Sequence, residues 1–153
     1  LTSHGPSWIG APAIWNAPAG TGNQGEGVVI GIIDGGINAA HPAFAAPGPV
    51  DGHAYSNPRS GYYGLCATVA GDCNDKLIGI YDFTGEGAQD GSDTTGHGTH
   101  VASTAGGNHL QSSAAGGISG VAPHAARALL GPLVDDEHRR RRERRSRVLE
   151  SRA

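Results

Sequence analysis

Residues 28–36 read VVIGIIDGG, and this stretch decides the fold. Val28 to Ile33 is a run of β-branched side chains interrupted only by Gly31, and Asp34 follows it directly. A short continuous apolar run of this kind predicts a strand buried on both faces, as in parallel sheets that helices cover. We therefore predict an α/β fold built on a parallel sheet with helices on both faces.

The segments on either side of this strand complete the expected order of elements. Residues 1–27 and 38–76 are rich in Gly, Pro and Asn and are typical of loops, and we expect Trp8 and Trp15 to anchor the first of them to the body. The further elements are a strand within KLIGIYDF (76–83), a helix over HGTHVASTA (97–105) that ends at Gly106-Gly107, and a strand that begins near Ala125 after the turn GVAP (120–123). We expect Val101 and Ala105 to turn toward the sheet, because positions four apart share one helix face.

Charge divides the chain at residue 127. Residues 1–127 carry nine Asp/Glu and three Lys/Arg, whereas residues 128–153 carry eight Arg and five Asp/Glu. Without aromatic residues or a binding motif, the basic run indicates a solvated tail rather than a nucleic-acid site. We hypothesise that the tail is read from a shifted frame of a GC-rich gene, and the alternative is a genuine basic extension. Residues 1–127 would then form the domain proper.

The sequence contains no segment that indicates a membrane. No apolar run approaches the length needed to span a bilayer, and no basic stretch followed by an apolar one opens the chain. We expect no membrane partner, and the oligomeric state is left open.

Cys66 and Cys73 lie seven positions apart in GLCATVAGDCND. The Gly, Asp and Asn around them predict a loop that a disulfide could close, which suits an oxidising compartment. Two free thiols are the main alternative, because a metal site would need further Cys or His at ligand spacing.

Asp34 is the first candidate for chemistry. α/β folds build their sites at the carboxyl ends of parallel strands, which is where Asp34 is expected. Taken alone, a turn Asp that bonds to the local backbone is the more common case. A nucleotide site is disfavoured, because GIIDGGI lacks the G-x-G-x-x-G order and a P-loop Lys.

His97 is the second candidate. It lies between two glycines in GHGTH, so a substrate and an acid could both reach its ring. As a lone histidine it would more often be structural. His97 and His100 do not suggest zinc, since they are three apart rather than four and no Glu lies between them.

Together these stretches resemble the subtilase family of serine proteases, particularly the larger members of plants and bacteria. VVIGIIDGGINAAHPAF resembles the segment around the family's catalytic Asp, GHGTHVASTAGG the segment around its catalytic His, and ISGVAPHA the approach to the next core strand. The resemblance covers about residues 1–127. It implies the first part of a subtilisin-like fold, with Asp34 and His97 as acid and base of an Asp–His–Ser triad.

The resemblance also implies a secreted, extracellular endopeptidase that acts on polypeptides. It implies no required cofactor, and although calcium stabilises many members, no calcium ligands can be assigned here. The family's Gly-Thr-Ser-Met-Ala type segment around the nucleophile and its oxyanion Asn segment are absent, and neither Ser103 nor Ser119 matches the nucleophile position. We expect this chain to belong to a family of active endopeptidases but to be inactive on its own. The alternative is a non-catalytic fragment or pseudoenzyme that at most binds peptides or a partner.

Overall fold

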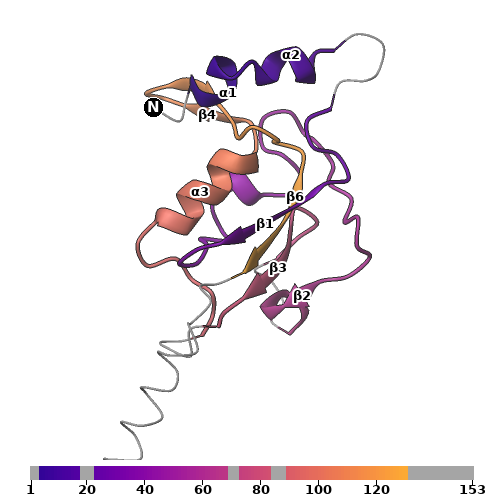
Figure 1. Cartoon of the computed structure of the whole chain (residues 1–153), viewed down its shortest axis with the longest axis vertical. Helices are drawn as coiled ribbons and strands as arrows, with labels where there is room; N and C mark the ends of the chain where they lie inside the picture. The colour runs from indigo at the N-terminus through magenta and orange to yellow at the C-terminus, as the bar shows by residue number, and fades with distance from the viewer. Residues whose placement is uncertain (1–3, 18–22, 69–72, 84–88, 131–153) are drawn as a thin grey trace, which may run out of the picture.

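The computed structural model describes residues 4–17, 23–68, 73–83 and 89–130 (Figure 1). The predicted tail falls almost wholly outside these ranges. Within them a four-stranded sheet carries one long helix, with two short helices at one end of the molecule. An α/β fold with a parallel sheet, as predicted from the VVIGIIDGG stretch, is confirmed.

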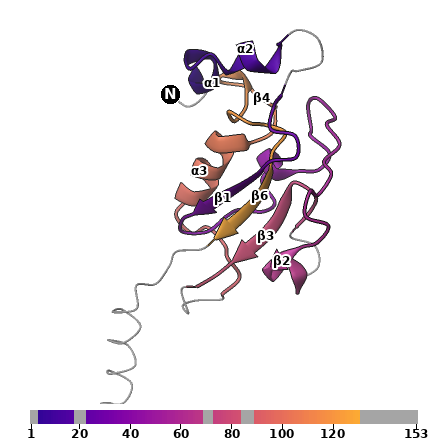
Figure 2. The same ribbon diagram turned by 45° about the vertical axis from the view of Figure 1, so that its right-hand side comes forward.

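The strands of the sheet lie in the order β1-β6-β3-β2, and every neighbouring pair is parallel (Figure 2). They are β1 (Val29–Ile33), β2 (Tyr63–Gly64), β3 (Leu77–Tyr81) and β6 (Ala126–Leu130). The last strand in the sequence thus inserts between β1 and β3, pairing Val29 with Ala126 and Gly79 with Ala128. The strands predicted within residues 76–83 and from about residue 125 are confirmed, and β6 extends across the boundary expected at residue 127.

The remaining elements are short, apart from one helix. They are the helices α1 (Gly5–Trp8), α2 (Ala11–Trp15) and α3 (His97–Gly106), the 3₁₀ helices η2 (Pro42–Phe44) and η3 (Leu65–Ala67), and a hairpin of β4 (Leu110–Ser112) and β5 (Gly116–Ile118). The helix predicted from His97 is confirmed. In the described part of the chain, no helix is both long enough and apolar enough to cross a membrane.

The N-terminal segment is helical in part, contrary to the expectation of a loop. Pro6 and Pro12 lie at the first turns of α1 and α2, where a residue without an N–H is tolerated. Trp15 anchors the segment by donating an indole hydrogen bond to the carbonyl of Val121 at 3.0 Å. Trp8 does not, since it is 90% exposed.

The helix α3 packs on the sheet beside β1 through its smallest residues. Gly98, Ala102 and Gly106 are its buried positions. The expectation that Val101 and Ala105 make this face is therefore wrong, since both are only partly buried. Residues with little or no side chain allow the helix backbone to approach the sheet closely.

The prediction that the first strand is buried on both faces is also wrong. β1 is an edge strand of the described sheet, and Val28 and Ile33 are 48% and 58% exposed. Full burial is instead found in β3, where Leu77 and Ile78 lie almost entirely out of solvent. Burial of a parallel strand depends on neighbours at both edges and layers on both faces, and β1 lacks some of these here.

The core lies between α3, β3 and the loops that follow β1. It contains one aromatic residue, Phe44 of η2, among aliphatic and small side chains: Ile37, Ala43, Cys66, Leu77, Ile80 and Ala102. The Cys66–Cys73 disulfide closes at the margin of this core with a Cα–Cα distance of 5.5 Å. That distance is within the normal range for a bridge.

Lys76 is fully buried just before β3. Its Nζ atom donates hydrogen bonds to the Tyr55 hydroxyl at 2.7 Å and to the carbonyl of Pro123 at 2.5 Å. The same atom lies 4.2 Å from the centre of the Tyr55 ring, a cation–π contact. This network fixes the segment before β6 against the start of β3.

Candidate active site

Asp34 lies at the carboxyl end of β1, as expected from its place in the sequence. Its Oδ1 atom accepts a hydrogen bond from the backbone N–H of Gly35 at 2.7 Å. The Asp34 side chain is only 13% exposed, so the carboxylate is largely covered by its neighbours. Asp34 therefore makes the local backbone hydrogen bond that is common for an Asp in a turn. It also makes a second contact, with His97.

His97 is the first residue of α3, and its side chain contacts Asp34 at the edge of the sheet where β1 ends. Its Nδ1 atom lies 2.8 Å from Oδ1 and 2.9 Å from Oδ2 of Asp34, although 63 positions separate the two residues. The imidazole is 70% exposed. A ring held at Nδ1 by a carboxylate and open to solvent presents Nε2 for proton transfer.

Two glycines bring the strand end and the helix start together. A Cβ atom at Gly98 would lie 3.2 Å from both Cβ and Oδ1 of Asp34 and would collide with the carbonyl of Gly36. Gly36 has a φ of 136° and leaves no room for a side chain against the backbone of Ser92. The glycines on both sides of the site are therefore required for Asp34 and His97 to meet.

Asp93 organises the start of α3, a role that the sequence analysis did not identify. Its carboxylate accepts hydrogen bonds from the backbone N–H groups of Thr95, Gly96 and Thr99 at 2.8–3.1 Å. Thr99 in turn accepts a bond from the Asn38 N–H at 2.9 Å. An Asp shortly before a helix is a known signal for such capping and could have revealed this residue.

The protonation equilibria follow from these contacts. The hydrogen bond with Asp34 raises the pKa of His97 above its ordinary value, and the bonds from His97 and Gly35 lower the pKa of Asp34. Burial alone would raise the pKa of Asp93, but the hydrogen bonds from Thr99, Gly96 and Thr95 lower it to about 2. At neutral pH the site therefore holds two carboxylates around one titratable imidazole.

The other candidates lie away from this pair. Ser103 donates its hydroxyl to the His100 carbonyl and is six residues beyond His97 on the same helix, a rise of roughly 9 Å. Ser119 precedes Gly120, whose N–H bonds to Gly107 at the far end of α3. Neither serine is placed for proton transfer to His97. Among the described residues, the side chains close enough together to hold one metal ion are Asp51, His109 and His124, and neither His97 nor His100 belongs to this group.

Comparison with known proteins gives a consistent result. The sequence profile of the subtilase family matches residues 25–139. Subtilisin-like protease SBT2.1 of Arabidopsis thaliana is 38% identical over 153 aligned residues, covering 86% of this chain and 18% of the relative. Subtilisin-like protease SBT2.2 of the same plant is 34% identical, covering 81% of this chain and 17% of the relative. The chain thus spans less than a fifth of the length of these relatives.

Proposed function

We propose that this chain, which belongs to the subtilase family, supplies the acid and the base of a serine endopeptidase. The observation that carries the proposal is the 2.8 Å contact between His97 Nδ1 and Asp34 Oδ1. An imidazole oriented by a buried or half-buried carboxylate is the arrangement by which such enzymes activate a hydroxyl.

The chemistry follows from this orientation. Asp34 holds the ring in the tautomer with a proton on Nδ1, which leaves the lone pair on Nε2 free. Nε2 accepts the proton of a serine hydroxyl as the oxygen attacks a peptide carbonyl. The resulting imidazolium is stabilised by the Asp34 charge and then protonates the leaving amine.

The nucleophile and the oxyanion donor belong, in this proposal, to a polypeptide segment that residues 1–153 do not contain. The positions of Ser103 and Ser119, described above, support this assignment. So does the position of β1 at the edge of the described sheet, because an unpaired strand edge is where further strands of a larger sheet would pair.

Substrates and location follow from the same premise. The substrates are polypeptides, and the reaction needs only protein groups, so no cofactor is required. We place the protein outside the cell, which agrees with a disulfide between Cys66 and Cys73, since such bonds persist in oxidising compartments.

A chimera tests the proposal. Residues 25–130 of this chain replace the matching part of subtilisin-like protease SBT2.1, and hydrolysis of peptide substrates is measured. We expect hydrolysis that falls by about 10⁴-fold or more in His97→Ala or Asp34→Asn, because the triad acts as a unit. His100→Ala is the matched control, a neighbouring exposed histidine of α3, and should retain activity.

Two outcomes of this experiment would contradict the proposal. One is a folded chimera without activity, which would favour the pseudoenzyme alternative. The other is equal activity in the His97→Ala and His100→Ala chimeras.

A further inference from the structure

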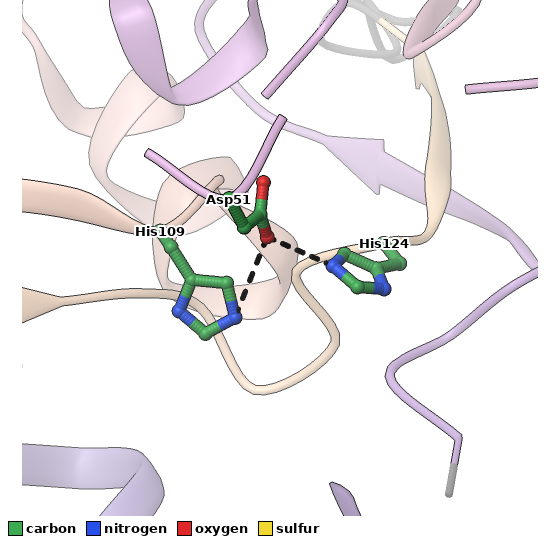
Figure 3. A group of neighbouring side chains, drawn as sticks. All are labelled: Asp51, His109 and His124. Atoms are coloured by element: carbon green, nitrogen blue, oxygen red, sulfur yellow. Dashed lines mark hydrogen bonds and ion pairs between the residues drawn. The ribbon is translucent and has the colours of Figure 1, made fainter. Parts of the chain in front are cut away.

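A second cluster of titratable side chains lies at the opposite end of α3 from His97. Asp51 comes from the loop after η2, His109 lies just before β4, and His124 just before β6. Their candidate ligand atoms all lie within 4.8 Å of one another. Figure 3 shows both imidazole rings directed at the Asp51 carboxylate. The proposed triad chemistry uses none of these three residues.

The spacing is close to that of a metal-binding site. The Nε2 atoms of His124 and His109 lie 3.0 Å and 3.9 Å from the same Asp51 oxygen, Oδ2. Nitrogen and oxygen ligands of tetrahedral zinc, each about 2.1 Å from the ion, are about 3.4 Å apart. Small rotations of the two rings would therefore bring the three atoms to coordination distance.

Neighbouring residues orient the His124 ring in the way that metal-bound histidines are oriented. The Nδ1 atom of His124 lies 2.6 Å from Oε1 of Glu26, so Nδ1 can keep its proton when an ion replaces the proton that Nε2 donates to Asp51. The His53 ring stacks on His124 with centroids 3.6 Å apart and planes within 4°. The ring is thus held in plane and in direction before any ion arrives.

Charge and access also suit a cation. Asp51 and Glu26 contribute two carboxylates, against one buried cation nearby, Lys76. The side chains of Asp51 and His109 are 29% and 28% exposed, so an ion and a water ligand can enter.

Binding of an ion would require the hydrogen bond between Gln24 and His109 to break. The Oε1 atom of Gln24 lies 2.8 Å from His109 Nε2, the same atom that would bind the metal. On coordination the proton of His109 would move to Nδ1, and the Gln24 amide would leave or add its oxygen to the shell.

We propose that Asp51, His109 and His124 form a site for a divalent transition-metal ion of the zinc type, with water completing its coordination. Two imidazoles and one carboxylate favour such ions over calcium and magnesium, which prefer oxygen ligands. The ion would tie the loop after η2 to the segments before β4 and β6. Asp51 and His124 alone are 73 positions apart, so the ion would act as a long-range cross-link.

Metal titration of the full chain, without an affinity tag, tests the site. We expect one Zn²⁺ to bind by calorimetry, Co²⁺ to give the visible absorption of a four-coordinate ion, and Zn²⁺ to raise the melting temperature. Ca²⁺ and Mg²⁺ should do none of these. His124→Gln, His109→Gln and Asp51→Asn should each weaken Zn²⁺ binding by at least about ten-fold, since loss of even a group behind a ligand typically costs that much in metal affinity. His100→Gln should bind as the unchanged chain does.

The ligand variants could lose Zn²⁺ binding simply because they fail to fold, so Glu26→Gln provides a second test. It keeps all three ligands and alters only the group that hydrogen-bonds to Nδ1 of His124. It should weaken Zn²⁺ binding by about ten-fold. The proposal is overturned if the folded chain binds no Zn²⁺, or if the Glu26→Gln and ligand variants bind it as tightly as His100→Gln. In either case Asp51 and His124 form only a surface hydrogen-bond network.

Discussion

The Nδ1 atom of His97 lies 2.8 Å from Oδ1 of Asp34, at the point where the start of α3 meets the end of β1. Each residue stabilises the charged form of the other, so the pKa of His97 is raised and that of Asp34 is lowered. Substitutions at Asp34, Gly98 and Asp93 can test this contact and the residues that support it.

Replacing Asp34 by Asn should lower the pKa of His97 toward its ordinary value, because the hydrogen bond to the carboxylate is the main cause of the shift. A raised pKa means that His97 stabilises the fold below pH 6.5 and that this contribution is lost as the pH rises through its folded pKa. NMR titration of the histidine ring protons measures the change. His100 serves as the internal reference, and a His97 titration curve that does not move would contradict the contact.

Gly98→Ala should destabilise the fold by about 1–3 kcal/mol, the usual effect of overpacking. Alanine is a better helix former than glycine by about 1 kcal/mol, but the clash with the Gly36 carbonyl and the closeness of Asp34 outweigh this gain. Urea denaturation measures the loss. Gly31→Ala on β1 is the control, since nothing lies within 4 Å of a Cβ atom there. Equal stability of the two variants would refute the close approach.

Asp93→Asn should destabilise the start of α3 by about 1–2 kcal/mol, since an amide oxygen cannot replace a carboxylate that accepts several N–H bonds. The pKa of Asp93 is lowered from 3.8 to about 2, so its contribution is present above pH 3.8 and lost as the pH falls toward 2. Melting temperatures measured across this window should therefore converge for the two chains at low pH. Asp90→Asn, in the same loop, should have a smaller effect, because that carboxylate bonds mainly to Ser92.

The disulfide between Cys66 and Cys73 should contribute about 2–3 kcal/mol, the loop-closure estimate for a short loop. Double replacement by alanine should lower the urea midpoint accordingly. A reducing agent should lower the stability of the unchanged chain to that of the double variant and leave the variant itself unaffected. Two titratable thiols in the folded, unreduced chain would show that the bond is absent.

Residues 1–153 alone should neither hydrolyse peptides nor react with serine-directed phosphonate probes. His97 can act as a base only for a hydroxyl held near Nε2, and Ser103 and Ser119 lie elsewhere. Labelling analysed by intact mass spectrometry gives the answer. Labelling that disappears in Ser103→Ala or Ser119→Ala would reveal a nucleophile within this chain.

Local pattern alone was sufficient for several features. The apolar run before Asp34 predicted a parallel strand, KLIGIYDF predicted β3, and the residues from His97 predicted α3. These succeed because a strand or a helix is specified by residues close together in the chain. The motifs around Asp34 and His97 were also sufficient for the family, which the profile match over residues 25–139 shows independently.

The features that sequence reasoning missed depend on which segments become neighbours. The buried face of α3 was misassigned to Val101 and Ala105, because their four-residue spacing places them on one face without saying which face meets the sheet, whereas the close approach selects Gly98, Ala102 and Gly106. Asp93 did carry a local capping signal that the prediction did not use, and the folded loop before α3 shows which N–H groups it bonds.

The sequence by itself therefore determined the type of each long element, the family and the two residues, Asp34 and His97, that we propose as acid and base. Only the tertiary structure decided that β6 inserts between β1 and β3, that β1 lies at an exposed edge, and that Asp51 joins His109 and His124. The physical reason is that local periodicity fixes backbone conformation, while contacts between distant segments depend on how the whole chain packs and on which small residues permit close approach.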